Sequence, residues 1–143
     1  MPHTVLYLLA AAVLLIGAGC ADQIVESAPT VFDTPDTTPG PPATFSGIQA
    51  AVFTPTCAAS GCHDGTSRPN LSPAVAYNAI VDRQSSGSLD YIEPGDPDAS
   101  YLYLKITGDS RIIGDRMPKD QAPLSPATID SIRAWIAAGA LNN

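Results

Sequence analysis

Basic residues are scarce in this chain. Its 143 residues include seven Lys and Arg against fourteen Asp and Glu, which gives a formal net charge of -7. A nucleic-acid-binding protein usually has a basic face that neutralises phosphates. The acidic composition of this chain therefore excludes the usual kind of nucleic-acid-binding protein. The length suits one modest domain with a tail and excludes a large multidomain enzyme.

Large aromatic side chains are also few, with three Phe, five Tyr and one Trp. The chain has instead 14 Pro and 11 Gly, residues that favour irregular backbone. A core built from so few large side chains would bury little apolar surface. Small domains of this kind usually need an additional stabilising element. The sequence therefore predicts that something besides side-chain packing holds the domain together.

A single long hydrophobic run is present, over residues 5–16 (VLYLLAAAVLLI). A membrane-spanning helix needs about 20 apolar residues, so this run is too short to span a bilayer but is typical of a secretory signal. Small residues and then Cys20 follow it, a pattern that resembles a bacterial lipoprotein signal, in which the cysteine becomes the acylated first residue. The alternative is an ordinary signal cut near Ala18 or Ala21. Both interpretations predict export, with residues 1–20 as the signal peptide.

Residues 21–43 contain five Pro, no Lys or Arg and no helical or strand periodicity. We expect a Pro/Thr-rich tether here, followed by a domain over residues 44–143. A tether of this length is most useful if a lipid on Cys20 fixes its far end to a membrane. The expected location is therefore the periplasm or the outer membrane, as a lipoprotein.

The last hundred residues carry helical patterns and no alternating strand run, which predicts an all-α fold. Ser46 and Gln49 have capping-box spacing in a first short helix that Pro55 should end. Each later helix is predicted to start where a capping side chain precedes a proline, and Gly139 should end the last one. The predicted helices cover residues 44–54, 72–83, 96–107 and 125–139, separated by loops at 56–71, 84–95 and 108–124.

Two cysteines and a histidine lie within seven residues, Cys57-Ala-Ala-Ser-Gly-Cys62-His63. A Cys followed directly by His, with a second Cys just upstream, has the spacing logic of covalent haem attachment. The thiols of Cys57 and Cys62 would form thioethers, and His63 would lie under the iron as its proximal ligand. Four residues separate the cysteines, where the usual motif has two, so the spacing leaves open whether one or two thioether bonds form.

Two alternatives compete for the same residues. In an oxidising compartment Cys57 and Cys62 could form a disulfide, which would make the domain a haem-free, stapled interaction module. A zinc site is less favoured, because these cysteines and His63 supply three ligands and no further His or Cys lies nearby to complete four.

After the signal, Met117 is the only methionine and His63 is the only histidine. Ligation of one iron by two histidines of this chain is therefore excluded. Met117 lies 54 residues after His63, in a loop next to Pro118, and could bring a thioether to the distal face of the iron. The alternative is an ordinary gap-filling methionine.

Residues 45–143 resemble a small monohaem cytochrome c domain of the class with His and Met ligands, as found in exported bacterial lipoproteins and planctomycete-type cytochromes. The resemblance implies a bundle of about four short helices around one covalent haem c, with the first and last helices crossing beside it. The matching segments are residues 53–57, 62–63, 94–102, 116–118 and 132–140.

The resemblance also implies a function. Iron bound by both His63 and Met117 has no open position, so we expect one-electron transfer rather than catalysis, and no enzyme. A haem without the Met117 ligand would instead give a sensor or a peroxidase-like site. The expected partners are redox proteins of the cell envelope, and an acidic carrier favours a basic docking patch on them. The side chains expected to pack on the porphyrin are Ile48, Leu71, Ile80, Leu102, Ile106, Ile113 and Leu124.

Overall fold

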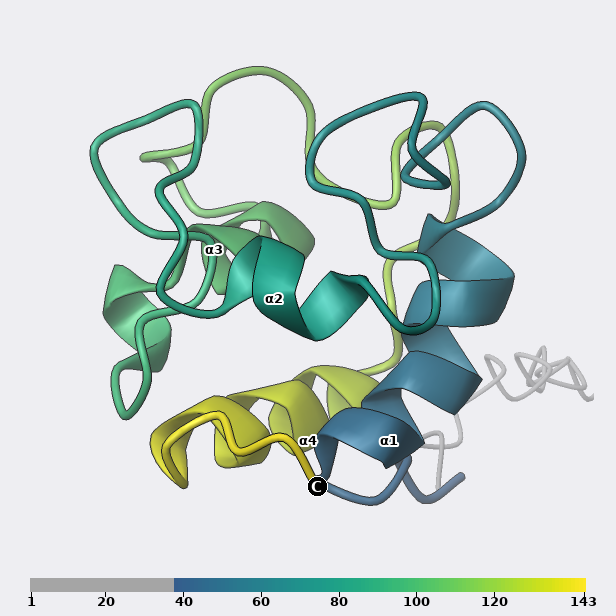
Figure 1. Ribbon diagram of the computed structural model, residues 1–143, viewed down its shortest axis with the longest axis vertical. Helices are drawn as coiled ribbons and strands as arrows, with labels where there is room; N and C mark the ends of the chain where they lie inside the picture. Colours follow the sequence, from purple (N-terminus) through teal and green to yellow (C-terminus); the bar gives the residue numbers. More distant parts are fainter. Residues whose placement is uncertain (1–37) are drawn as a thin grey trace, which may run out of the picture. The chain divides into compact units, whose positions relative to one another are not determined.

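A computed structural model describes residues 38–143 of the chain (Figure 1). The predicted signal peptide, Cys20 and residues 21–37 of the predicted tether lie outside the described residues. Between residues 38 and 143 there are helices and three isolated β-bridges but no strand, which confirms the all-α prediction. The elements are α1 (Phe45–Ile48), the π-helix η1 (Gln49–Cys57), α2 (Ala76–Ile80), the 3-10 helix η2 (Pro97–Ala99), α3 (Tyr101–Thr107) and α4 (Pro126–Ala137).

The first helix begins where Thr44 caps it. The Thr44 backbone is extended, as a capping residue requires, and its hydroxyl accepts a hydrogen bond from the Gly47 N–H at 3.1 Å. The predicted capping box at Ser46 is wrong, because Ser46 already lies inside the helix. The Gln49 amide donates instead to the Leu71 carbonyl at 3.0 Å, which ties the first helix to a later loop.

Pro55 does not end this helix, contrary to the prediction. The helix continues as η1 to Cys57, and the Ala58 N–H still bonds five residues back, to the Phe53 carbonyl at 2.6 Å. Proline usually breaks an α-helix because its ring clashes with the preceding turn and because it has no backbone N–H to donate a hydrogen bond. The wider turn of a π-helix leaves more room for the ring. The helix therefore delivers Cys57 at its last residue.

The second helix is shorter than predicted at both ends. Ala74 adopts a left-handed conformation with φ 69°, which interrupts the helix that Ser72 and Pro73 were expected to start. At the other end the backbone becomes extended, because the Ile80 carbonyl accepts from the Ile92 N–H at 3.0 Å. This bridge to the 84–95 loop competes with further helix.

The third predicted helix is divided in two. Asp96 caps it as expected, but its carboxylate holds only the 3-10 turn of η2. Ser100 is buried and extended, and its hydroxyl donates to the Asp96 carbonyl at 2.8 Å and accepts from the Glu93 N–H at 2.9 Å. α3 then runs to Thr107, the predicted end, where Gly108 takes the left-handed conformation that closes a helix.

The prediction for the last helix is confirmed at both ends. The Ser125 hydroxyl caps α4 through the Thr128 N–H at 3.2 Å, and Gly139 follows the helix at φ 95°. The described end of the tether contacts this helix, since a Cβ atom placed on Gly40 would lie 2.2 Å from the Ala127 carbonyl oxygen. Only glycine allows this close approach of the two backbones.

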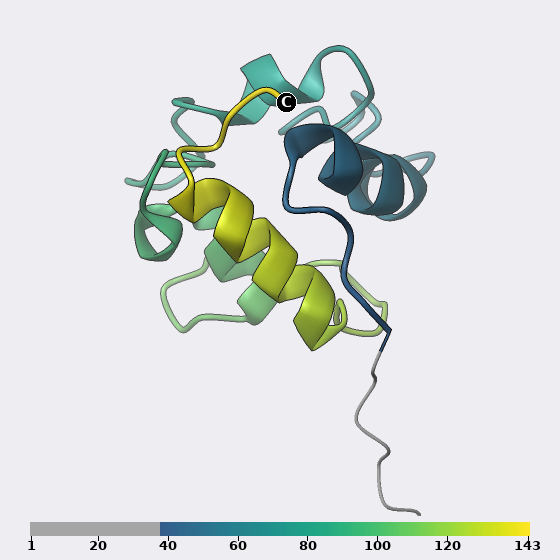
Figure 2. The same cartoon turned by 90° about the horizontal axis from the view of Figure 1, so that it is seen from below.

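α4 lies beside α1, as seen from below in Figure 2. Their shared side is buried, and the Phe45 and Trp135 rings lie 5.8 Å apart between centroids. The Trp135 indole N–H donates to the Leu141 carbonyl at 2.8 Å, so its polar atom is satisfied. The side chains of α1, η1 and α4 that are at most 3% exposed are Ile48, Val52, Phe53, Ile132, Trp135 and Ile136. The first described helix therefore packs on the last one.

The long loops gather away from α4. Figure 1 shows the loops after η1, after α2 and after α3 on the far side of α2 and α3. They bring residues distant in the sequence to one end of the domain. Among residues 38–143 no helix is both long enough and apolar enough to cross a membrane.

Candidate functional site

The loops enclose a cavity of about 390 Å³. Cys57, Cys62, His63 and Met117, the four residues predicted from the sequence, all line it. Three of them come from the end of η1 and the turn that follows, and Met117 comes from the loop between α3 and α4. The volume lies within the range of about 300–1,000 Å³ that is usual for cofactor and ligand sites.

Most of the cavity wall is apolar. Five of the seven side chains expected to pack on a porphyrin line it, but Ile48 and Ile80 do not, because both are completely buried in the core. The sequence pattern predicted that these two side chains point inward from their helices. It could not distinguish the packed core from the cavity as their surroundings. The five lining residues are Leu71, Leu102, Ile106, Ile113 and Leu124.

Sequence reasoning missed several residues of the wall. Tyr101 and Lys105 lie one helical turn apart, a spacing that predicts a shared face of α3 but not that this face borders a cavity. Tyr91 comes from an irregular segment that carries no periodic signal. The lining residues that the sequence did not assign to the site include Val52, Phe53, Tyr91, Tyr101, Lys105 and Ile132.

The turn from Cys57 to His63 is closed by its own backbone. The His63 N–H donates to the Cys57 carbonyl at 3.0 Å, and the Cys62 N–H donates to the Ala59 carbonyl at 2.9 Å. The Asp64 carboxylate accepts from the Thr66 N–H at 3.0 Å and from the Gly61 N–H at 3.1 Å, and hydrogen bonds from Thr66 first and Gly61 second lower the pKa of Asp64. The four residues between the cysteines thus form a compact turn that keeps both thiols and the imidazole at one cavity.

A backbone carbonyl fixes the tautomer of His63. The Nδ1 atom lies 2.9 Å from the Pro69 carbonyl oxygen, which can only accept, so Nδ1 carries the proton. In the neutral ring the other nitrogen, Nε2, then keeps its lone pair. A metal-binding histidine normally has this arrangement, since the hydrogen bond at one nitrogen orients the ring and strengthens the other as a ligand.

Both thiols are free in the structure. Burial raises the pKa of Cys57 to about 11, with a smaller contribution from the neighbouring Cys62, so the Cys57 thiol is protonated at neutral pH. Cys62 is exposed. Within the described residues no three His, Cys, Asp or Glu side chains cluster closely enough to hold a metal ion, which gives the zinc interpretation no support.

Met117 is held by its backbone on both sides. Its N–H donates to the Lys105 carbonyl at 2.8 Å, and its own carbonyl accepts from the Arg116 guanidinium at 3.1 Å. The same guanidinium donates to the Gln121 carbonyl at 3.0 Å, which closes the loop. Pro118 is buried directly after Met117. A loop without helix thus presents a half-buried thioether to the cavity.

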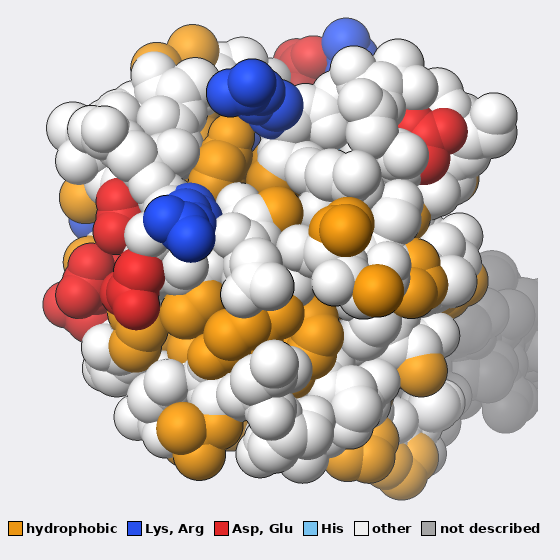
Figure 3. All heavy atoms as spheres, viewed as in Figure 1, with side chains coloured by type: hydrophobic (Ala, Val, Ile, Leu, Met, Phe, Trp, Pro, Cys, Tyr) orange, Lys and Arg blue, Asp and Glu red, His pale blue; other side chains and the backbone are white. Residues whose placement is uncertain are grey.

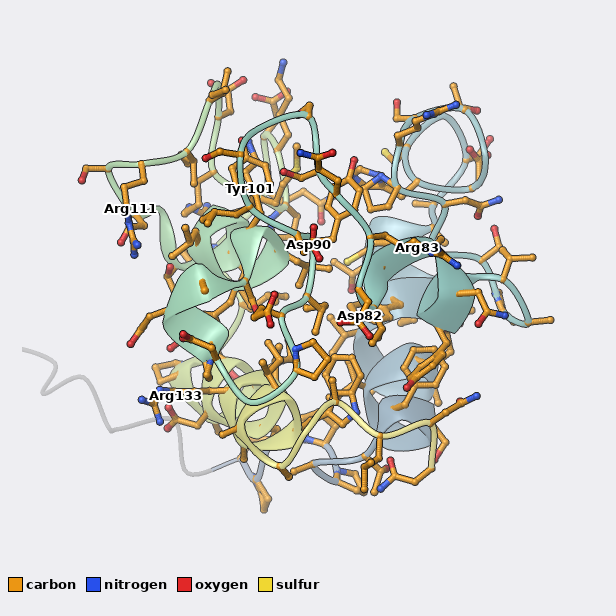
Figure 4. The ribbon with its side chains drawn as sticks, turned by 60° about the vertical axis from the view of Figure 1, so that its left-hand side comes forward. Asp82, Arg83, Asp90, Tyr101, Arg111 and Arg133 are labelled. Atoms are coloured by element: carbon orange, nitrogen blue, oxygen red, sulfur yellow. The ribbon has the colours of Figure 1, made fainter. Side chains whose placement is uncertain are left out.

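The charged side chains at the cavity all have one sign. Arg68, Lys105 and Lys119 line it, and no Asp or Glu does. On the face seen in Figure 3, Lys and Arg atoms lie beside hydrophobic side chains, while Asp and Glu gather nearer the edges. Arg111, by contrast, binds the Asp109 carboxylate at 2.8 Å at the outer edge of the domain (Figure 4) and holds the pKa of Asp109 down to about 2.

Comparison with known proteins adds no assignment. No protein-family model matches the chain, and no curated protein and no solved structure matches it. The function must therefore be argued from the site itself.

Proposed function

We propose that residues 44–143 form a monohaem c-type cytochrome domain that carries single electrons. One observation supports this most strongly: Met117 lines the same cavity as Cys57, Cys62 and His63, although 54 residues separate it from His63. Cys57 and Cys62 would hold one haem c through thioethers. His63 would be the proximal and Met117 the distal iron ligand.

The donor set fits this cofactor. Two thiols suit covalent attachment, while an imidazole with a free Nε2 and a neutral thioether suit the two axial positions of a haem iron. The tautomer that the Pro69 carbonyl imposes on His63 is the one that ligation through Nε2 requires. A disulfide-stapled module would have no need for either the oriented imidazole or the thioether at the cavity.

The apolar wall suits the same group. Leu71, Leu102 and Ile106 offer hydrophobic contact to a porphyrin in the cavity. When bound, haem supplies one-electron redox chemistry, and a thioether ligand in an apolar shell raises its potential. Arg68 provides a cationic side chain at the cavity that an anionic haem carboxylate can meet.

The proposal places the domain in electron transfer rather than catalysis. His63 and Met117 together would occupy both axial positions, which leaves no position for a substrate. The lipid on Cys20 and the tether would attach the carrier to a membrane facing the periplasm. Redox proteins of the cell envelope would then be its donors and acceptors.

The decisive experiment is to produce the exported protein together with haem-maturation machinery and to record the haemochrome spectrum after denaturation. We expect a red protein whose haem remains on the chain. Replacing both Cys57 and Cys62 by Ala should abolish retention, whereas Ser60→Ala, between them, should leave it intact. The two single cysteine variants then show whether one or two thioethers form. A colourless protein without free thiols would instead identify the disulfide-stapled interaction module.

The distal ligand is tested separately. Met117→Ala should keep the haem attached, lower the reduction potential and open the iron to small ligands. Val75→Ala, an exposed residue outside the cavity, is the control and should change none of these. An unchanged spectrum and potential in Met117→Ala would exclude Met117 as ligand while leaving haem attachment standing.

The membrane anchor has its own test. Mass spectrometry of the membrane-bound protein should find a lipid on Cys20 as the first residue. Cys20→Ala should release the protein from the membrane. A lipid-free N-terminus near Ala21 would leave the cytochrome proposal intact and remove the tethered location.

A further inference from the structure

The loop that carries Met117 folds back onto the helix that precedes it. It leaves α3 after the left-handed Gly108 and returns along the same helix. Two α3 side chains meet it, Tyr101 and Lys105, which lie one turn apart on one face. The Tyr101 hydroxyl accepts a hydrogen bond from the Ile113 N–H at 3.0 Å. Figure 4 shows Tyr101 at the end of the domain that holds the loops, away from Arg133 on α4.

Lys105 holds the same loop at three alternate residues. Its ammonium donates to the carbonyls of Ile113, at 3.0 Å, and Asp115. Its own backbone carbonyl accepts from the Met117 N–H at 2.8 Å. Lys105, a residue of a regular helix, therefore fixes the irregular segment at Ile113, at Asp115 and at Met117, which carries the thioether. Lys105 also lines the cavity.

The ammonium of Lys105 does not take part in an ion pair between described residues. The two ion pairs found there are Arg111 with Asp109 and Lys119 with Asp115. Lys119 and Asp115 both belong to the loop, so their ion pair leaves the loop unattached to α3. The charge of Lys105, in contrast, is directed entirely at loop carbonyls, and hydrogen bonds with a charged donor are stronger than neutral ones.

We infer that Lys105 is a positioning residue that clamps the loop and so keeps the Met117 thioether at the cavity. The inference rests on the proposed function for its consequence at the iron, but the clamp itself is a property of the chain. Methionine has three rotatable side-chain bonds and a weakly binding sulfur. Such a ligand competes well only when its backbone is already placed, because ordering a free loop at each binding event is costly.

The test compares Lys105→Met with Lys119→Met. Both variants remove one lysine charge from the cavity, but only the first removes bonds between α3 and the loop. Amide hydrogen exchange over residues 109–121 should be about tenfold faster in Lys105→Met, roughly the loss of one charged hydrogen bond, and unchanged in Lys119→Met. Lys105→Arg should restore most of the protection. This measurement needs no haem and is made on the full chain as purified.

The second readout is at the iron. Haem-loaded Lys105→Met should keep its covalent haem but show a lower reduction potential, a weakened thioether-to-iron absorption band and tighter binding of small ligands. Lys119→Met should match the wild type. If Lys105→Met fails to fold, Tyr101→Phe, which keeps the ring and removes one loop contact, serves as a milder variant with the same expected direction.

The outcomes separate the two proposals. Equal exchange in Lys105→Met and Lys119→Met would overturn the clamp, whether or not the protein binds haem. Faster exchange with an unchanged potential would show that the loop position does not govern the ligand, which also overturns the inference. A haem-free wild type with a faster loop in Lys105→Met would refute the proposed function and leave the clamp standing.

Discussion

The two ends of the domain are built by different means. At the end formed by α1, η1 and α4, which we term the sealed end, side chains fill the interior, and Ile48 and Ile136 are 0% exposed. At the other, which we term the cavity end, loops surround about 390 Å³ of space. There the chain is held mainly by hydrogen bonds from side chains to backbone carbonyls, such as His63 to Pro69 and Lys105 to Ile113.

This difference explains how a chain with few large side chains forms a domain. The only Trp and two of the three Phe residues meet at the sealed end, where the Phe45 ring lies 6.4 Å from Phe53 and 5.8 Å from Trp135 between centroids. The cavity end has no comparable cluster. Interiors of proteins are normally close-packed, and the cavity end departs from this with a space of about 390 Å³.

The largest effect should follow from removing the centre of the sealed end. Trp135→Ala should lower the free energy of unfolding by about 3–5 kcal/mol, because the indole is 1% exposed and its removal leaves a void. Urea denaturation followed by circular dichroism measures this. Val75→Ala is the control, since Val75 is 44% exposed and its truncation should cost within about 0.5 kcal/mol. Similar losses in both variants would contradict a sealed core around Trp135.

The presence or absence of haem should change the cost of a core truncation at the cavity end but not at the sealed end. Ile136→Ala should cost about 2–5 kcal/mol in protein produced with or without haem, because Ile136 does not border the cavity. Leu102→Ala should cost a comparable amount only in the haem-loaded protein. Without haem it should cost about 1 kcal/mol, because Leu102 then faces an unfilled space and loses fewer contacts. Equal costs for Leu102→Ala in both forms would show that nothing packs on this wall.

A smaller effect tests the corrected start of the sealed end. Thr44→Ala removes the hydroxyl that caps α1 and should cost about 1 kcal/mol of stability. Ser46→Ala should cost almost nothing, because the Ser46 hydroxyl caps no N–H of this helix and is exposed. Denaturation midpoints of the two variants measure the difference. A larger loss in Ser46→Ala would restore the capping box expected from the sequence.

The smallest effect is a pH dependence of the haem-free cavity end. Because burial raises the folded-state pKa of Cys57 from 9.0 to about 11, the thiol favours folding while it is protonated. This contribution should be complete below pH 9 and decline as the pH rises towards 11. Urea denaturation across this window measures it, and Cys57→Ala should lack this part of the decline. If the free energy of unfolding depends on pH identically in the wild type and in Cys57→Ala, the Cys57 thiol is exposed to solvent rather than buried.

Predictions from the sequence were correct where the interaction joins residues close together in the chain, and wrong where it joins distant segments. Ser125 caps α4 and Gly139 follows its end as predicted, because both signals act within one helical turn. The helices expected at residues 72–83 and 96–107 were altered by contacts with the 84–95 segment, which no local pattern reveals. The Ile80 carbonyl binds the Ile92 N–H, and the Ser100 hydroxyl binds the Glu93 N–H.

The candidate site divides in the same way. The sequence by itself determined the chemistry, since Cys57, Cys62, His63 and Met117 are the only residues after the signal that could supply two thiols, an imidazole and a thioether. Only the tertiary structure decided that these groups share one cavity, that Pro69 orients His63 and that Lys105 holds the loop of Met117. Residue types are encoded one position at a time, whereas a shared cavity depends on loop closures across 54 residues, which only the packed helices fix.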